Sequence, residues 1–269
     1  MTQPLGLSLS KSATPMPEFF SPKNLLEMSS DRDFARNTPV RMRYSILSSQ
    51  RSGSTLLARM LFETRKAGDP LEFFNLRLVR LAQVQTGNQS LTPIEFMRLM
   101  ELRRTSPNGV FGMKIHYEQM LRAFQTNVPN QKMIEFLRNQ DRLLWIRRRD
   151  RLRQAISHAV ATQTNSWSSE EPQKAPAGSV SCLDCINSLQ IISFQDFGWE
   201  QFIRVAKLQA RVVWYEDLIS DYEETCRLVL RNLKLESAVP SIPPPPIQSQ
   251  SGAVNDRLYE ELTRYLGLS

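Results

Sequence analysis

Residues 44–57, YSILSSQRSGSTLL, pass from an apolar run through a turn of small polar residues into a helical pattern. The first part, residues 44–49, predicts a short buried strand, and apolar residues then recur at helical spacing from Leu56 onward. Residues 48–55, where one pattern gives way to the other, contain one Arg, one Gly and five hydroxyl side chains. A helix that begins in this way offers unpaired backbone N–H groups and the positive end of its dipole. The turn therefore predicts a binding site for an anion.

Each polar residue of this turn suits an anionic ligand. Gly53 allows close approach to the backbone, and the hydroxyls of Ser52, Ser54 and Thr55 can donate hydrogen bonds. Arg51 adds a planar cation that can pair with two oxygens at once. The turn is not the nucleotide-triphosphate motif G-x-x-x-x-G-K-[ST], because the first Gly and the Lys are missing. An ordinary capped helix is the alternative interpretation.

Strands and helices alternate along the rest of the chain. Further strands are expected at 110–115, 143–146 and 211–215, and helices at 22–27, 54–66, 91–104, 131–139, 151–164, 180–206, 222–233 and 255–266. This alternation predicts an α/β fold with a parallel sheet covered on both faces. Residues 1–40 are expected to form a partly irregular arm, and residues 41–269 a single domain. The polar loop at 167–178 is long enough to act as a lid.

The composition of the chain limits the classes of binding partner that it can have. Of 269 residues, 41% are hydrophobic, and 34 Lys and Arg against 27 Asp and Glu give a net charge of +7. A basic balance suits nucleic acid, acidic lipid or a polyanionic small ligand, or simply a soluble protein with a few extra arginines. No apolar run reaches the length of a membrane span, and residues 1–20 lack the basic start and apolar block of a secretory signal, so a cytoplasmic protein is expected.

Three cysteines, Cys182, Cys185 and Cys226, are expected to be reduced thiols. The first two have the spacing of a zinc or redox motif, but no second pair exists to complete four ligands. We therefore interpret them as incidental helix residues and predict no metal.

A second anion site is predicted where the third strand ends. Five arginines fall within residues 147–153. An Arg at the end of a parallel strand lies at the sheet edge where ligands bind, and Ser157 on the following helix could meet the same anion. A solvated basic helix face and a nucleic-acid surface are the alternatives. No groove-reading motif or aromatic-rich segment accompanies the arginines, so we expect no nucleic-acid partner.

Two residues are candidates for a general base. Glu72 precedes Phe73 and Phe74, and partial desolvation there would raise its pKa and improve it as a base. A surface Glu beside a hydrophobic anchor is the alternative. Side chains alternate between the two faces of a strand, so Lys114 and His116, two residues apart, lie on one face of the second strand and can share a site. His116 is the second candidate base, although a lone His is more often structural.

Two anion sites, a candidate base and no magnesium motif suggest one ligand, 3′-phosphoadenosine 5′-phosphosulfate (PAPS), which has a 5′-phosphosulfate and a separate 3′-phosphate. Four motifs also carry a family resemblance: SSQRSGSTLL (48–57), AGDPLEFF (67–74), NGVFGMKIHY (108–117) and IRRRDRLRQAISHAVATQTNSW (146–167). In this order and spacing, over about residues 43–167, they resemble the trehalose 2-sulfotransferase-like family of PAPS-dependent sulfotransferases.

The resemblance implies a P-loop-like sulfotransferase fold and roles for several residues. The 5′-phosphosulfate loop corresponds to Gln50, Arg51, Ser52, Gly53, Ser54 and Thr55, and the 3′-phosphate pair to Arg148 and Ser157. Glu72 corresponds to the proposed base, and Asp69 to an acidic position that contacts the substrate. Related cytosolic sulfotransferases have their catalytic His in a similar Lys-x-His strand end, so His116 could share that role.

Two departures from the family concern the acceptor and the 3′-phosphate. Leu71 stands where the trehalose enzyme has Gln, and with Phe73 it indicates a less polar acceptor pocket. The segment 247–252 lacks the basic residue expected near the 3′-phosphate.

We therefore expect transfer of a sulfuryl group from PAPS, leaving 3′-phosphoadenosine 5′-phosphate (PAP), to a small acceptor such as a carbohydrate or secondary metabolite. A hydroxyl is expected in preference to an amine. Glu72 or His116 would take the acceptor proton, while Arg51 and Lys114 stabilise the leaving phosphate. The alternatives are a nucleic-acid-binding protein, a magnesium-dependent phosphotransferase and a non-catalytic binding module. By analogy with dimeric relatives, a homodimer is an expected assembly.

Overall fold

A four-stranded parallel sheet forms the centre of the molecule. The computed structural model describes residues 20–35, 37–167, 179–246 and 252–268. The strands are β1 (Met42–Ser48), β2 (Val110–His116), β3 (Arg142–Arg147) and β4 (Ala210–Trp214), in the order β2-β1-β3-β4. Leu47 pairs with Ile115 on one side and Trp145 on the other, so β1, β2 and β3 end together. The predicted α/β fold and parallel sheet are confirmed.

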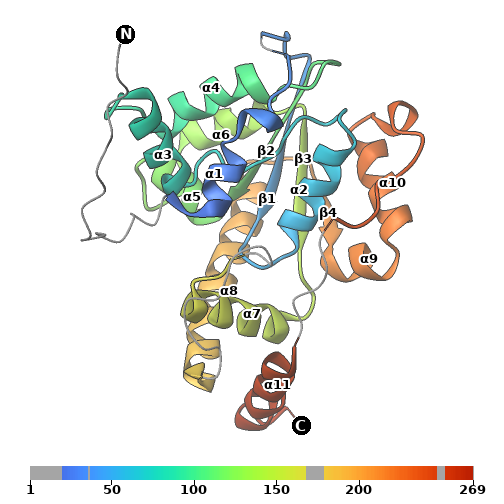
Figure 1. The fold of residues 1–269 in the computed structure, drawn as a ribbon. Coiled ribbons are helices and arrows are strands. Elements are labelled where there is room, and N and C mark those ends of the chain that lie inside the picture. The colour runs from blue at the N-terminus through green and yellow to red at the C-terminus, as the bar shows by residue number, and fades with distance from the viewer. Residues whose placement is uncertain (1–19, 36, 168–178, 247–251, 269) are drawn as a thin grey trace, which may run out of the picture.

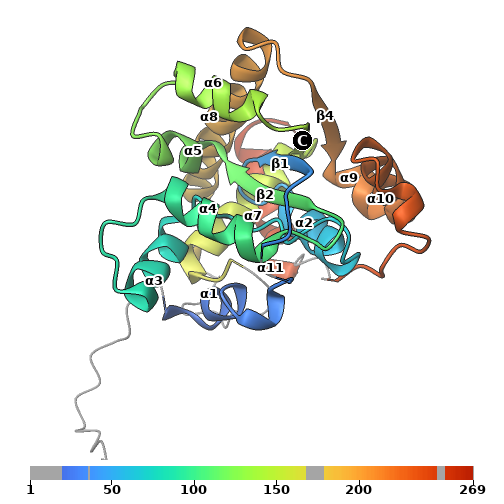
Figure 2. The same ribbon diagram turned by 90° about the horizontal axis from the view of Figure 1, so that it is seen from above.

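Helices cover both faces of this sheet (Figures 1 and 2). They are α1 (Pro22–Glu27), α2 (Ser54–Glu63), α3 (Leu76–Thr86), α4 (Pro93–Arg104), α5 (Tyr117–Ala123), α6 (Gln131–Arg138), α7 (Arg151–Thr164), α8 (Cys182–Val205), α9 (Tyr215–Ser220), α10 (Tyr222–Asn232) and α11 (Ala253–Tyr265), with short 3₁₀ turns η2 (Ser30–Arg32) and η4 (Glu236–Ala238). Among the described helices, none combines the length and hydrophobicity needed to cross a membrane.

The strands are apolar on both sides because each face has its own core. Tyr44 and Ile46 of β1 pack with α2 and α10, whereas Leu47 faces the core formed with α3 to α6 and α8. A third cluster joins α7, α8 and α11, and contains the free thiol of Cys185. Cys182 and Cys185 lie in the first turn of α8, as their helical interpretation predicts.

The sequence-based prediction lacks three helices of the structure, α3, α5 and α9. The helices α5 and α9 start directly at Tyr117 and Tyr215, the residues that follow β2 and β4. The third, α3, has an Asn75 N-cap and a left-handed Gly87 C-cap, residue types that typically mark the ends of a helix in a sequence. The predicted end of α2 at Lys66 is wrong: the helix ends at Glu63, and Arg65 has φ +56°.

The Asp69 carboxylate forms ion pairs with both the segment before β1 and helix α4. It accepts hydrogen bonds from Arg32, at 2.9 and 2.5 Å, and from Arg104 at 2.8 Å. Asp69 is 1% exposed and Arg104 is 0% exposed. Arg104 also donates to the backbone carbonyls of Glu27 and Ser29, so this ion cluster attaches α1 and η2 to the domain.

Asp69→Asn should lower the free energy of unfolding by roughly 3 kcal/mol, because removing one charge of a buried ion pair leaves the other uncompensated. Urea unfolding measures the change. Asp31→Asn, on the exposed η2 turn, is the matched control and should shift stability by less than about 0.5 kcal/mol. Equal stability of the two variants would contradict a structural role for Asp69.

Candidate active site

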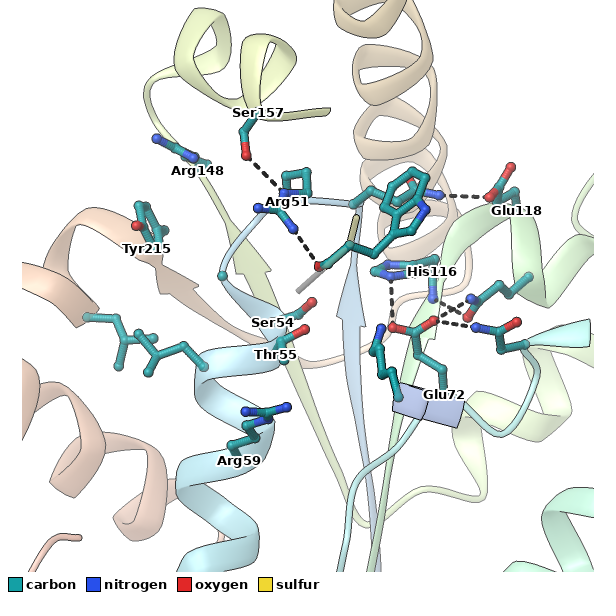
Figure 3. Close-up of a pocket in the computed structure, with 18 of the residues that line it drawn as sticks. Arg51, Ser54, Thr55, Arg59, Glu72, His116, Glu118, Arg148, Ser157 and Tyr215 are labelled. Carbon is teal, nitrogen blue, oxygen red and sulfur yellow. Dashed lines mark hydrogen bonds and ion pairs between the residues drawn. The ribbon is translucent and has the colours of Figure 1, made fainter. Parts of the chain in front are cut away.

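A cavity of about 700 Å³ opens at the carboxyl ends of β1, β2 and β3. Its lining includes Gly53 and Thr55 after β1, His116 at the end of β2, and Arg148 after β3 (Figure 3). Glu72 reaches it from the segment between α2 and α3. The parallel sheet thus assembles one site from the three segments singled out in the sequence, and its volume suits a small-molecule ligand.

The turn after β1 has the backbone of an anion-binding loop. Gly53 caps α2 with φ +88°, and a Cβ atom there would lie 2.4 Å from Cδ2 of Tyr215. Both the conformation and the space therefore require glycine. Ser54 and Thr55 begin α2 and line the cavity. Ser52 does not fit its predicted side-chain role, because its buried Oγ donates to the Ser49 carbonyl at 2.8 Å.

A residue missed in the sequence holds this turn in place. Gln154 on α7 is fully buried, and its Nε2 donates to Ser49 Oγ at 3.0 Å and to the Gln50 carbonyl at 2.7 Å. The side chain of Gln50 in turn donates to Glu118 at 2.7 Å. Gln154 lies within the basic segment 147–157, and its contacts with residues 49 and 50 are distant in sequence, so no local pattern indicates its role.

The two predicted anion sites are adjacent rather than separate. Arg51 Nε donates to Ser157 Oγ at 2.9 Å, and its Nη1 donates to the Trp167 carbonyl at 2.7 Å. Arg51 therefore turns from the loop after β1 toward the residues predicted for the 3′-phosphate. Figure 3 shows Arg51 between Ser157 and the turn, with Arg148 beside them.

The side chain of Arg148 lines the cavity and is largely buried. Its guanidinium stacks on the Tyr215 ring at 4.6 Å, and its side chain is only 15% exposed. Burial lowers the pKa of Arg148, and its Nε finds no hydrogen-bond partner among the residues that the structure describes. Among the described residues, Oε1 of Glu216 lies 3.9 Å from the Arg148 Nε. Because Arg148 lines the cavity, its guanidinium can pair with an anion bound there.

Glu72 sits at the centre of a second network. Lys114 Nζ lies 2.8 Å and His116 Nε2 3.4 Å from its Oε1. The other oxygen, Oε2, accepts hydrogen bonds from Gln119 at 2.7 Å and Asn75 at 3.2 Å. Lys114 also donates to Thr55 Oγ1 at 3.0 Å, so it connects the carboxylate to the anion-binding turn.

The prediction that partial desolvation raises the pKa of Glu72 is wrong. Burial does raise it, but the positive charges of Lys114 and His116 outweigh burial and hold the pKa of Glu72 well below its ordinary value. Phe73, one of the two neighbouring rings, lies in the core and is stacked on Phe111 at 5.7 Å.

A Glu72 base should therefore work in mildly acidic solution. Its depressed pKa keeps the carboxylate ionised above pH 4.5, so kcat/KM should stay constant as the pH falls from 7 to about 5. A histidine base must be neutral to accept a proton, so it would lose activity as acid protonates the imidazole. A pH profile of kcat/KM distinguishes the two, and a loss of activity between pH 7 and about 5 would contradict Glu72.

None of the three predicted acceptor contacts lines the large cavity. Asp69 is in its buried ion cluster, Phe73 is in the core, and Leu71 is half-buried against that core. The lining near Glu72 is formed instead by residues that the sequence did not single out: Lys23, Asn24, Arg59, Phe74, Asn75, Leu76, Arg77, Glu118, Gln119 and Arg122. Phe74, not Phe73, is the ring on this side, and Asn75 is recognisable as an N-cap.

Two predictions lie largely outside the described residues: the lid, of which only Trp167 is described, and the segment 247–252, of which only Gly252 is described. Within the part of the chain that the structure places, no three His, Cys, Asp or Glu side chains gather into a group that could hold a metal ion.

Comparison with known proteins shows the family of the chain. A family model described as Stf0 sulphotransferase matches residues 43–265, nearly the whole chain. The chain belongs to the Stf0 sulphotransferase family.

Two relatives are trehalose 2-sulfotransferases. The chain is 26% identical to that of Mycolicibacterium smegmatis (strain ATCC 700084 / mc(2)155) over 256 residues, 82% of this chain and 94% of the relative. It is 26% identical to that of Mycobacterium tuberculosis (strain ATCC 35801 / TMC 107 / Erdman) over 188 residues, 58% of this chain and 70% of the relative. As an Stf0 sulphotransferase, the chain is a transferase with an α/β fold, as expected from its sequence.

Proposed function

We propose that this Stf0 sulphotransferase moves the sulfuryl group of PAPS to a hydroxyl of a small-molecule acceptor. One observation carries the proposal: a single cavity contains an anion-binding turn, a buried arginine with an unsatisfied donor, and an ionised carboxylate beside them. PAPS has two phosphate-bearing ends and needs a base for the incoming hydroxyl, so its chemistry matches all three features.

The residues present fit the donor at both ends. Gly53, Ser54 and Thr55 at the start of α2 would hold the 5′-phosphosulfate, where the helix dipole favours negative charge. Arg148, Ser157 and Arg51 would hold the 3′-phosphate, since all three line the cavity and Arg51 contacts Ser157. When bound, the donor supplies a sulfur atom that leaves the 5′-phosphate oxygen and bonds to the acceptor oxygen.

Glu72 acts as the base, and its neighbours fix its position. Hydrogen bonds from Gln119 and Asn75 occupy Oε2, which orients the carboxylate. The proton of the acceptor hydroxyl passes to Glu72. Lys114 lies between Glu72 and Thr55, where its charge favours both the carboxylate and the negative charge that grows on the leaving phosphate. His116 contacts Glu72 through Nε2 and Ser48 Oγ through Nδ1, at 3.0 Å, which suits a positioning role.

Sulfuryl transfer can be tested with ³⁵S-labelled PAPS. Purified protein should release PAP and transfer the label to hydroxylated acceptors, and EDTA should leave the rate unchanged. Failure to bind PAP, or loss of activity in EDTA that magnesium restores, would instead favour a phosphotransferase.

A further inference from the structure

Two neighbouring residues of helix α5 contact both halves of the proposed site. Glu118 Oε1 accepts a hydrogen bond from Nε2 of Gln50, in the anion-binding turn, at 2.7 Å. Gln119, the next residue, donates to the candidate base Glu72 at 2.7 Å. Because α5 begins directly after β2, no loop separates these two side chains from the sheet. The first turn of α5 thus connects the anion-binding turn with the candidate base.

The contacts of Gln50 fix the orientation of its carboxamide. A carboxylate only accepts hydrogen bonds, so Nε2 of Gln50 must face Glu118, and its Oε1 must face the other way. There Oε1 accepts a hydrogen bond from Nε2 of Gln195 on α8, and Gln195 is 1% exposed. Gln154 on α7 donates to the backbone carbonyl of Gln50 at 2.7 Å. Three helices therefore hold the residue that precedes Arg51 in the turn.

The candidate base is held from the same turn of α5. Oε1 of Gln119 accepts a hydrogen bond from the His116 N–H at 3.3 Å while its Nε2 donates to Glu72, so this carboxamide is oriented as well. Figure 3 shows Glu118 on the side of His116 and Glu72. Of the two successive side chains, Glu118 therefore contacts the donor-binding turn and Gln119 contacts the base.

The distance between that turn and the base is critical for group transfer. The acceptor oxygen, the sulfur and the leaving oxygen must lie in line, and a misplacement of about 1 Å can cost roughly 10²-fold in rate. A displaced turn would move the leaving phosphate relative to Glu72. A hydrogen bond from an amide to a carboxylate is stronger than one between neutral groups, which suits it to hold this distance.

We propose that Glu118 and Gln50 are positioning residues for sulfuryl transfer, and that their hydrogen bond sets the place of the anion-binding turn relative to Glu72. Gln195 completes the arrangement, because its amide orients the Gln50 carboxamide. Neither Glu118 nor the Gln50 side chain contacts the reacting atoms. The inference rests on the proposed function, since it assigns two further residues to the same reaction.

An exchange of the two side chains tests this inference, because it preserves both hydrogen bonds of residue 50. In the double variant Gln50→Glu with Glu118→Gln, the new amide at position 118 donates to one carboxylate oxygen at position 50, and Gln195 donates to the other. Gln50→Glu alone instead brings two carboxylates together, and like charges at this distance repel. Glu118→Gln alone keeps a neutral hydrogen bond, since the new amide oxygen can accept from Gln50.

Turnover should therefore follow the hydrogen bonds and not the number of substitutions. The rate of PAP release is measured at saturating PAPS with trehalose as the probe acceptor. Gln50→Glu should lose roughly 10²-fold and Glu118→Gln about threefold, whereas the double variant should recover to within about tenfold of the natural protein. A double variant no more active than Gln50→Glu would overturn the inference. A larger loss in Glu118→Gln than in Gln50→Glu would also overturn it, because Glu118 would then act on the acceptor directly.

A second cycle covers the case in which Gln50→Glu does not fold. Gln50→Ala and Glu118→Ala remove the same hydrogen bond, so the double alanine variant should be no slower than the slower single variant. Losses that multiply would contradict the inference. Gln131→Glu is the matched control, because Gln131 donates to Glu135 in the same way, at 3.0 Å, on the exposed surface of α6, and it should retain full activity.

The same assay separates this inference from the proposed function. A natural protein that binds no PAP and releases none from PAPS would defeat both. An active natural protein whose double variant shows no rescue would defeat the positioning role alone.

Discussion

Glu72→Gln should lower kcat by roughly 10²–10⁴-fold, the usual contribution of a general base. Gln keeps the shape and one acceptor oxygen for Gln119 and Asn75, but it cannot take the acceptor proton. Because the Glu72 side chain is only 16% exposed, water does not readily replace it. Initial rates at saturating PAPS measure the loss, and PAP affinity should change by less than threefold.

Two controls make this result specific. Glu135→Gln, on the exposed surface of α6, should retain full activity. His116→Ala should cost less than Glu72→Gln, because His116 acts through its contact with the carboxylate. If His116→Ala abolished turnover while Glu72→Gln left it intact, the base would be His116.

Arg148→Ala should weaken PAP binding by roughly 10²-fold, the size expected when a charged hydrogen-bonding partner of a phosphate is lost. The variant also loses the stacking on Tyr215 and the contact with Glu216, so an effect on PAP affinity has to be compared with a nucleotide that lacks the 3′-phosphate. The effect should fall on the 3′-phosphate alone. Calorimetry with PAP and with adenosine 5′-phosphate, which lacks that group, therefore provides the test.

The expected pattern is a large PAP preference in the natural protein and near-equal affinities in the variant. Arg149→Ala is a stringent control, because this neighbour is exposed and pairs with Asp217 at 2.5 and 2.9 Å. It should retain the preference for PAP. A preference that survives in Arg148→Ala would show that another residue binds the 3′-phosphate.

The anion-binding end of the site could be predicted because its determinants are local. The turn at 48–55 and the arginines at 147–153 each follow an apolar strand, and parallel strands bring their carboxyl ends together. The pairing of Lys114 and His116 followed from alternation along β2. No long-range information was needed for these features.

The acceptor end depends on contacts between distant segments, which one sequence does not reveal. Lys23 and Asn24 reach the cavity from helix α1, which is attached through the Asp69 cluster. Burial raises the pKa of Glu72, but Lys114 and His116 of strand β2 lower it by more, so the sequence neighbours of Glu72 predicted the wrong direction. Adjacent Phe73 and Phe74 look equivalent in the sequence, yet only Phe74 lines the cavity.

A crystal structure of the protein with PAP tests the central claim most directly. We predict the 5′-phosphate against the backbone amides at residues 53–55, and the 3′-phosphate within hydrogen-bond distance of both Arg148 and Ser157. Glu72 should face the open space beside the 5′-phosphate. A nucleotide bound in the reverse orientation, or at a site that includes neither Gly53 nor Arg148, would contradict the account.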